Sequence, residues 1–327
     1  MHKILKFLVF LLIFSSFVFS GEKIVVGVEL EPDRINPLYD EDHDPTLQLV
    51  FSGLTNHDEH NKIIPELAKE WKVSEDGLEY TFILRDDVFW HDGVKFGVDD
   101  VIFTIKSAMD KKLNAPAISN YENVKSVEKL NENSLKVTLK EPFPPFLDAL
   151  SFGMIPKHIL ENKDISKDKF NSNPVGTGPY KVSKWKKGEF IEFVANNNFY
   201  KNTPKIKNVF LKIIPDAKTR FLQLKSGDID VAMIDSSFVN LLQNDEKIKI
   251  LRFKSADYRA LMFNFKNEIF KDQNVRIALN YFINKDEIVK NVLHDYGFKI
   301  NNPLALFKFA KNSKFVYEYN PKKAMKF

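Results

Sequence analysis

Short strand patterns and short helix patterns interleave irregularly along the chain, and this arrangement constrains the fold more than any other feature of the sequence. Residues 23–30 (KIVVGVEL), 79–84 and 190–195 are rich in β-branched and aromatic residues and alternate as strands do. Residues 99–109 and 274–281 space their apolar side chains as amphipathic helices do. Because the sequence shows neither a steady β–α–β period nor an internal repeat, we expect a mixed α/β fold.

Several shorter segments complete the expected order of elements. Residues 46–54 and 66–72 have helical spacing, and residues 126–139 read as a pair of strands. Residues 56–61 (NHDEHN) form a polar turn, and residues 260–264 are apolar and strand-like.

Composition excludes several classes of protein. The 327 residues contain no cysteine, which rules out a disulfide scaffold, a cysteine-ligated zinc site, a thiol nucleophile and a lipid-anchored cysteine. The length is sufficient for about two domains. A net charge of +4 is small for a nucleic-acid binder of this size, so we expect no nucleic-acid partner.

The first twenty residues predict a secretory signal peptide. Lys3 and Lys6 precede an apolar run that ends in small residues, and Val18 and Ser20 suit cleavage before Gly21. A single membrane anchor is the alternative, but the apolar run is short for a span of about 20 residues. We therefore expect an exported protein without a lipid anchor, and we place it in the periplasm.

Sequence motifs of catalysis are not found. The sequence lacks a G-x-S-x-G elbow, a phosphate-binding loop, a G-x-G-x-x-G turn and an H-E-x-x-H helix, so we expect no enzyme and no cofactor. The densest group of metal-ligand types is His57-Asp58-Glu59-His60. His57 and His60 are therefore candidate metal ligands, although the same residues also suit a hydrated turn.

Four sequence blocks, taken together and in order, resemble one family. They are PELAKEWKVSEDGLEYTFILRDDVFWHDGVKFGVDDV at 65–101, PVGTGPY at 174–180, NFYKNTPKIKNVFLKIIPDAKTRFLQLKSGDIDVAMI at 198–234 and VRIALNYFINKDEIVKNVL at 275–293. The chain resembles the family 5 extracellular solute-binding proteins, which serve peptide and nickel ABC importers. One departure is Phe96-Gly97-Val98, where the family usually has a Leu-Thr-Ala-like approach to Asp99.

The resemblance implies an architecture. It implies a two-lobed cleft fold like that of the type II periplasmic binding proteins. Residues 21–54 and 175–258 are expected to form the main part of the first lobe, and residues 55–174 its extra subdomain. Residues 259–327 are expected to begin the second lobe. Family members are considerably longer, so the resemblance also implies a truncated chain with an incomplete second lobe.

The resemblance further implies candidate ligand-binding residues. Glu41, Asp42 and His43 lie in the loop from Tyr39 to Asp44, which matches a pocket segment of the family, and they are expected to contact the backbone or charge of a ligand. Tyr121 is expected to stack on the ligand or to hydrogen-bond with it, and Asn264 to offer its amide.

The expected function is that of a periplasmic substrate-binding component of an ABC importer, which captures short peptides between its lobes and delivers them to permease subunits in the inner membrane. Nickel or a nickel chelate is the alternative ligand. The sequence also leaves open a non-functional truncated product and, from a different class of protein, a secreted hydrolase. A secreted hydrolase would need a nucleophile motif that the sequence does not show.

Overall fold

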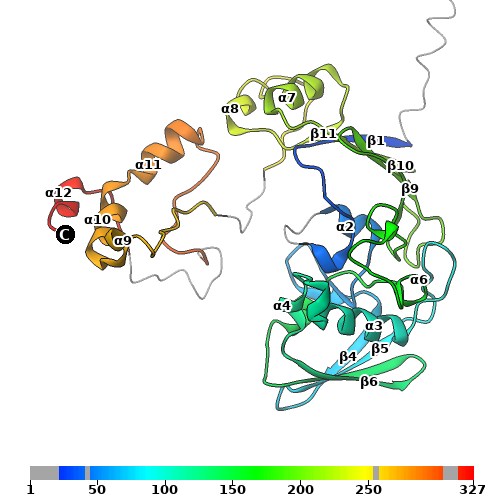
Figure 1. The fold of residues 1–327 in the computed structure, drawn as a ribbon. Coiled ribbons are helices and arrows are strands. Elements are labelled where there is room, and N and C mark those ends of the chain that lie inside the picture. Colours follow the sequence, from blue (N-terminus) through cyan, green and yellow to red (C-terminus); the bar gives the residue numbers. More distant parts are fainter. Residues whose placement is uncertain (1–21, 41–44, 253–257, 305–315) are drawn as a thin grey trace, which may run out of the picture. The chain divides into compact units, whose positions relative to one another are not determined.

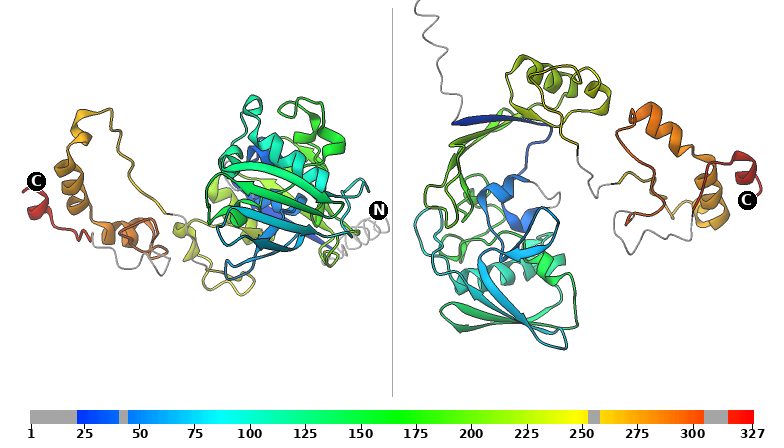
Figure 2. Two further views of the ribbon diagram at one scale, coloured as in Figure 1. Left: turned by 90° about the horizontal axis from the view of Figure 1, so that it is seen from below. Right: turned by 180° about the vertical axis from the view of Figure 1, so that it is seen from behind.

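The computed structural model describes residues 22–40, 45–252, 258–304 and 316–327, and the chain divides into two compact units between Ala232 and Met233. Figures 1 and 2 show the chain in three orientations. Each unit is described by itself below.

A five-stranded mixed sheet forms one part of the first unit (Figure 1). Its order is β11-β1-β10-β9-β8, where β1 is Lys23–Val28, β8 Tyr180–Lys186, β9 Phe190–Ala195, β10 Asn208–Ile213 and β11 Val231–Ala232. β1 runs parallel to both β10 and β11, whereas the pairs β10–β9 and β9–β8 are antiparallel. The first strand of the unit therefore lies inside the sheet and pairs with strands that come much later in the sequence.

A four-stranded antiparallel sheet forms the other part of the first unit. Its order is β4-β5-β7-β6, with β4 at Ala68–Val73, β5 at Glu79–Leu84, β6 at Val124–Asn131 and β7 at Ser134–Leu139. Tyr80, Phe82 and Leu84 alternate as the buried face of β5. A separate hairpin joins β2 (Thr55–His57) to β3 (Ile63–Pro65).

Helix α3 (Val98–Met109) lies against the four-stranded sheet, where it contacts β6. Val101, Ile105 and Ala108 recur at helical spacing and are buried, so they form the face that packs on the sheet. At the start of the helix, Asp100 accepts a hydrogen bond from the backbone N–H of Gly97 at 3.0 Å, which adds a side-chain link across the first turn.

Short helices connect the strands of the first unit. They are η1 (Pro37–Tyr39), α2 (Pro45–Val50), η2 (Lys111–Leu113), α4 (Ile118–Tyr121), α5 (Phe146–Ala149), α6 (Lys157–Leu160), η3 (Lys169–Asn171) and α7 (Ala217–Ser226). One continuous apolar core spans both sheets: Phe82, Val101 and Leu135 belong to the same cluster as Ile191 and Phe193.

The described part of the second unit is helical. It contains α8 (Ser236–Val239), α9 (Glu268–Lys271), α10 (Gln273–Phe282), α11 (Lys285–Glu287), the π-helical turn η4 (Ile288–Val292) and α12 (Pro321–Ala324). Tyr281 of α10 packs edge-on against Tyr317 and stacks on Phe327, which holds α10 to α12.

Two expected elements are wrong. Residues 66–72 do not form a helix, because Ala68–Val73 is strand β4 and pairs with β5. Backbone hydrogen bonding to a neighbouring strand outweighs the helix propensity of this Glu- and Lys-rich segment. Residues 260–264 do not form a strand in the described part of the second unit. The expected strands at 79–84, 190–195 and 126–139 and the helix at 99–109 are confirmed to within a few residues.

The division into compact units comes earlier in the chain than the lobe boundary expected after residue 258, and the lobe assignments stay predictions. The expected signal peptide, residues 1–20, lies outside the described residues. Within the described ranges no helix is both long enough and apolar enough to cross a membrane.

Candidate functional site

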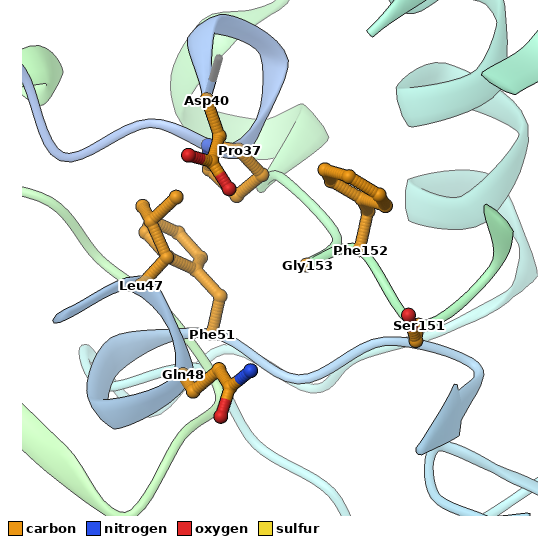
Figure 3. Close-up of a pocket in the computed structure, with 8 residues that line it drawn as sticks. All are labelled: Pro37, Asp40, Leu47, Gln48, Phe51, Ser151, Phe152 and Gly153. Atoms are coloured by element: carbon orange, nitrogen blue, oxygen red, sulfur yellow. The ribbon is translucent and has the colours of Figure 1, made fainter. Parts of the chain in front are cut away.

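A pocket opens on the first unit between η1, the middle and end of α2 and the loop at 151–153 (Figure 3). Its empty volume, including space open to solvent, is about 450 Å³. The lining residues are Pro37, Asp40, Leu47, Gln48, Phe51, Ser151, Phe152 and Gly153. Figure 3 shows the Asp40 carboxylate on one side of the space and the Phe152 ring across from it. The opening combines one carboxylate and one amide with aromatic and aliphatic walls.

Asn36 fixes the η1 side of the pocket. Its buried side chain accepts a hydrogen bond from the backbone N–H of Leu38 at 3.0 Å, which caps the short helix. Its amide donates to the side-chain oxygen of Asn171 at 2.8 Å, and Ile35 N–H donates to the Asn171 carbonyl at 2.8 Å. The residues immediately before Pro37 and Asp40 are therefore tied to a distant part of the chain.

The loop at 151–153 is held close to the segment that follows α2. Leu54 N–H donates to the Leu150 carbonyl at 2.8 Å, and Met154 N–H donates to the Ser52 carbonyl at 3.0 Å. A Cβ added at Gly153 would lie 2.4 Å from the Cβ of Phe51, so only glycine permits this approach. Phe51 and Phe152 are thereby fixed as neighbouring walls of the pocket.

The PVGTGPY turn, residues 174–180, contacts the last residue of α2. Gly178 N–H donates to the Val50 carbonyl at 2.8 Å, and a Cβ at Gly176 would lie 1.8 Å from the same oxygen. The His91 side chain joins the two glycines, since its Nδ1 accepts from Gly176 N–H at 3.1 Å and its Nε2 donates to the Gly178 carbonyl at 3.0 Å. Burial lowers the pKa of His91 to about 4, so the imidazole is neutral at pH 7.

A buried acid anchors the start of β4 beside these segments. Glu66 is 5% exposed and accepts hydrogen bonds from the Tyr200 hydroxyl, the Lys201 ammonium and the Asn56 amide. Burial, together with the neighbouring Glu66 carboxylate, raises the pKa of Tyr200. These groups satisfy one another, so we interpret them as a structural network rather than as a site.

A comparison of the sequence with family profiles shows to which family the chain belongs. Residues 62–327 match the profile of the bacterial extracellular solute-binding proteins, family 5. The chain belongs to this family. Its members are solute-binding proteins of ABC transporters, and the type II periplasmic binding protein-like mixed α/β fold that the resemblance implied is confirmed.

Solved structures and curated relatives of this family-5 chain bind different ligands. The NikZ structure from Campylobacter jejuni, in complex with Ni(L-His), is 52% identical with a TM-score of 0.90 and covers 94% of this chain. The oligopeptide-binding protein AppA from Bacillus subtilis is 34% identical over 93% of this chain, and its structure with a nonapeptide gives a TM-score of 0.83. The heme-binding protein A from Haemophilus influenzae is 31% identical over 80%.

This family-5 chain is shorter than these relatives. It spans 58% of the curated AppA sequence, 52% of the heme-binding protein and 62% of the NikZ chain.

Three of the ligand-binding residues expected from the family resemblance, Glu41, Asp42 and His43, lie outside the described residues. Asp40, which precedes them directly, lines the pocket. The pocket therefore includes one residue of the predicted ligand loop, and the role of Glu41, Asp42 and His43 stays a prediction.

Tyr121 and Asn264 are described, and the structure places them in different surroundings. Tyr121 ends α4 inside the core of the first unit, is 1% exposed, and its hydroxyl has no hydrogen-bond partner among the described residues. Burial raises its pKa. Asn264 lies in the second unit on an exposed turn, where its side-chain oxygen accepts from Lys266 N–H at 3.0 Å. Their roles as ligand contacts stay predictions, and Tyr121 is closed off from solvent in this structure.

The two candidate metal ligands, His57 and His60, have different partners. The Nε2 atom of His57 lies 3.0 Å from an Asp148 carboxylate oxygen, whereas His60 is exposed and lies 3.7 Å from Glu59. Asp58 accepts from the backbone N–H groups of His60 and Lys62, as a side chain in a tight turn does. The described residues contain no group of three or more potential metal ligands, and the role of His57 and His60 as metal ligands stays a prediction.

Sequence reasoning missed most of the pocket walls. Asp40 falls in the predicted loop, but its individual role was not assigned. Gln48 and the segment Ser151-Phe152-Gly153 carry no motif that would mark them. Only the close packing of Gly153 on Phe51, a contact between segments a hundred residues apart, creates that wall.

Proposed function

We propose that this chain is part of the substrate-binding component of an ABC importer and that its ligand is a small nickel chelate, such as nickel bound by histidine. The observation that carries the proposal is the 52% identity, across 94% of this chain, to a protein whose structure holds Ni(L-His). The proposal includes a periplasmic location, delivery to permease subunits, and binding without covalent chemistry.

The pocket of the first unit supports a ligand of this class. Nickel is the cargo and not a resident cofactor, and its chelator presents amino and imidazole groups beside an aliphatic portion. The Asp40 carboxylate is suited to an amine or a metal-bound N–H, because a charge-assisted hydrogen bond is stronger than a neutral one. The Gln48 amide offers both a donor and an acceptor, and Phe51 and Phe152 cover the apolar portion.

Short peptides are the second candidate ligand. The specific observation in their favour is the similarity to AppA, whose structure contains a nonapeptide. The identity to that protein is 34%, which is well below the identity to NikZ. We therefore place the nickel chelate first.

Thermal unfolding in the presence of single and combined ligands tests the proposal. The purified chain is heated with nickel chloride alone, L-histidine alone, both together, or a set of di-, tri- and nonapeptides. Saturation at about 100 times the dissociation constant stabilises a protein by about 2.7 kcal/mol, which corresponds to an increase of several degrees in Tm. We expect this increase with nickel and histidine together. An increase with peptides only would replace the nickel chelate by the second candidate.

A carboxylate variant tests the pocket. Asp40→Asn removes the one charge among the described residues that line the pocket and is expected to weaken binding of the nickel–histidine complex about tenfold or more, measured by isothermal titration calorimetry. Asp33→Asn, seven residues earlier on the exposed surface, is the matched control and should leave affinity unchanged. Equal affinities for both variants would show that the ligand binds elsewhere.

A further inference from the structure

Positive charge is unevenly distributed along the first unit. Residues 180–213, which contain β8, β9 and β10, hold eight lysines, no arginine and two glutamates. Residues 55–174, by contrast, hold 21 acidic residues against 16 basic ones. The whole chain has a net charge of +4, so these three strands are strongly basic in a chain whose charges otherwise nearly balance.

The two faces of the five-stranded sheet differ in composition. The side chains of β9 and β10 that belong to the core are Ile191, Phe193, Val209 and Leu211. Because side chains alternate across a strand, the residues between them lie on the opposite face, which is called the outer face below. Together with their cross-strand partners on β1 and β8, the outer face includes Lys23, Lys184, Lys186, Phe190, Phe210 and Lys212.

Two phenylalanines form the apolar centre of the outer face. The rings of Phe190 and Phe210 are half-buried, and their centres lie 6.1 Å apart. The Lys23 ammonium lies 4.2 Å from the centre of the Phe210 ring, and the Lys184 ammonium lies 5.7 Å from that of Phe190. Attraction between cation and ring holds the lysine stems along the apolar surface while the charged ends stay in water.

Most of the positive charge on the outer face is not neutralised by the chain itself. Among the described residues Lys186 pairs with Glu189 at 2.7 Å, whereas Lys23, Lys184 and Lys212 make no ion pair. Glu192 also lies on this face, opposite Lys184 in the strand register, and offsets one charge. An excess of positive charge therefore remains around the two aromatic rings.

The kind of basic residue distinguishes between two kinds of occupant. Protein–protein interfaces are enriched in arginine, whose planar fork matches a carboxylate, and are depleted in lysine. The basic residues of the outer face are all lysines. Lysine is a compact point charge, and lysines beside phenylalanine are typical of surfaces that bind anionic lipid headgroups. The composition of the face therefore favours a lipid surface over an acidic protein.

We propose that the outer face is a binding surface for a membrane that carries anionic phospholipid headgroups. The ammonium groups of Lys23, Lys184 and Lys212 contact the lipid phosphates, and the two phenylalanine rings lie at the level of the headgroups. The acidic excess of residues 55–174 lies outside this sheet, so the charge distribution favours one orientation of the first unit on the membrane. The inference does not depend on which ligand the pocket binds.

Co-sedimentation with vesicles tests the proposal. The protein is used in its exported form, without the predicted signal peptide, so that the apolar residues 1–20 do not themselves insert into the bilayer. The vesicles contain phosphatidylcholine alone, or equal parts of phosphatidylcholine and phosphatidylglycerol, and each is used at low and at high salt. We expect binding to the phosphatidylglycerol vesicles about tenfold or more stronger than to phosphatidylcholine alone, and high salt should weaken it.

A pair of charge reversals assigns the binding to the outer face. Lys23→Glu combined with Lys184→Glu is expected to weaken binding to the anionic vesicles about tenfold or more, because each lysine near an anionic lipid surface raises affinity roughly fivefold. Lys72→Glu combined with Lys125→Glu is the matched control, since it changes the net charge equally at exposed positions on β4 and β6. The control should bind nearly as the wild type does. Circular dichroism of both variants checks that the sheets persist.

Three outcomes overturn the proposal. The first is the absence of binding to phosphatidylglycerol vesicles at millimolar lipid concentrations. The second is equal weakening by the two pairs of charge reversals, which would make the net charge responsible rather than the outer face. The third is binding to soluble poly-L-glutamate without binding to vesicles, which would make an acidic protein the occupant.

Discussion

His91 shows how one side chain fixes a turn through its neutral form. Its two ring nitrogens have opposite roles, because Nδ1 accepts from Gly176 N–H and Nε2 donates to the Gly178 carbonyl. Protonation would turn Nδ1 into a second donor, facing the Gly176 N–H. Burial lowers the pKa of His91 to about 4, which keeps the imidazole neutral and leaves Nδ1 able to accept.

The first prediction at this scale concerns pH. In the unfolded chain His91 takes up a proton near pH 6.5, whereas in the folded chain it does so only near pH 4. Its contribution to stability is therefore complete above pH 6.5 and is lost as the pH falls towards 4. Between pH 7.5 and 4.5, the stability advantage of the wild type over His91→Asn should shrink by about 2–3 kcal/mol, measured by urea unfolding.

The control for this prediction is His60→Asn, on an exposed turn. A stability difference between wild type and His91→Asn that stays constant with pH would contradict the assignment of the neutral histidine to the turn.

At the scale of residues, the tight turn at 174–180 could be predicted from the sequence, whereas its contact with His91 could not. The glycines of PVGTGPY indicate a tight backbone passage, and the structure shows that they let the chain approach the Val50 carbonyl. The WHDG segment predicts a turn at His91, but the contact of His91 with a segment 85 residues away could not be predicted, because nothing local indicates it. The burial of Tyr121 was missed for the same reason, since it results from long-range packing.

At the scale of elements, Asp100 ties α3 to its surroundings. One carboxylate oxygen accepts from Trp90 Nε1 at 3.2 Å and from Gly97 N–H at 3.0 Å, and the other accepts from Lys157 N–H at 3.0 Å. Burial raises its pKa, while these three donors oppose that increase. Asp100 lies in the first turn of α3, and its links to Trp90 and Lys157 are added by tertiary structure.

The prediction for α3 is that Asp100→Asn is destabilising. An amide has one acceptor and one NH₂ group, so in either orientation the NH₂ faces a backbone or indole donor. An unpaired buried donor costs about 1–3 kcal/mol, and we expect a loss in this range in urea unfolding.

Asp99→Asn is the control, because Asp99 is an exposed neighbour that pairs with Lys129 at 3.3 Å and such surface pairs contribute less than about 1 kcal/mol. Equal stabilities for the two variants would exclude the structural role assigned to Asp100.

Strand β4 shows where the reasoning from local pattern fails. Residues 66–72 carry helix-forming Glu, Lys and Ala, yet the segment pairs with β5 and begins with the buried Glu66 network. Alternation in β5, with Tyr80, Phe82 and Leu84 inward, is clear in the sequence because one face of that strand is buried. β4 is an edge strand with mostly exposed side chains, so the same signal is absent.

At the scale of the whole molecule, the two units differ in how much surface they bury. The first has a core that spans both sheets, and the described part of the second has three buried hydrophobic side chains, Val239, Leu242 and Ala324. Segments with few buried contacts open at low free energy, and proteases cut them first.

Limited proteolysis tests this difference. Brief trypsin treatment of the chain alone is expected to cut within residues 233–327 first and to leave a fragment that ends near Ala232, identified by mass spectrometry. Lysine and arginine occur throughout both units, so the availability of cleavage sites does not explain such a preference. Simultaneous loss of both units would contradict the difference in local stability.

The position of β1 in the five-stranded sheet has a consequence for the time course of folding. Val26 pairs with Leu211 in β10 and with Val231 in β11, so β1 has no partner in the sheet until those late strands have been synthesised. At about 5–20 residues per second, the ribosome takes on the order of 10–40 seconds to produce the intervening chain. During that interval β1 has no strand partner. Contacts of such long sequence separation also slow the formation of the sheet after synthesis.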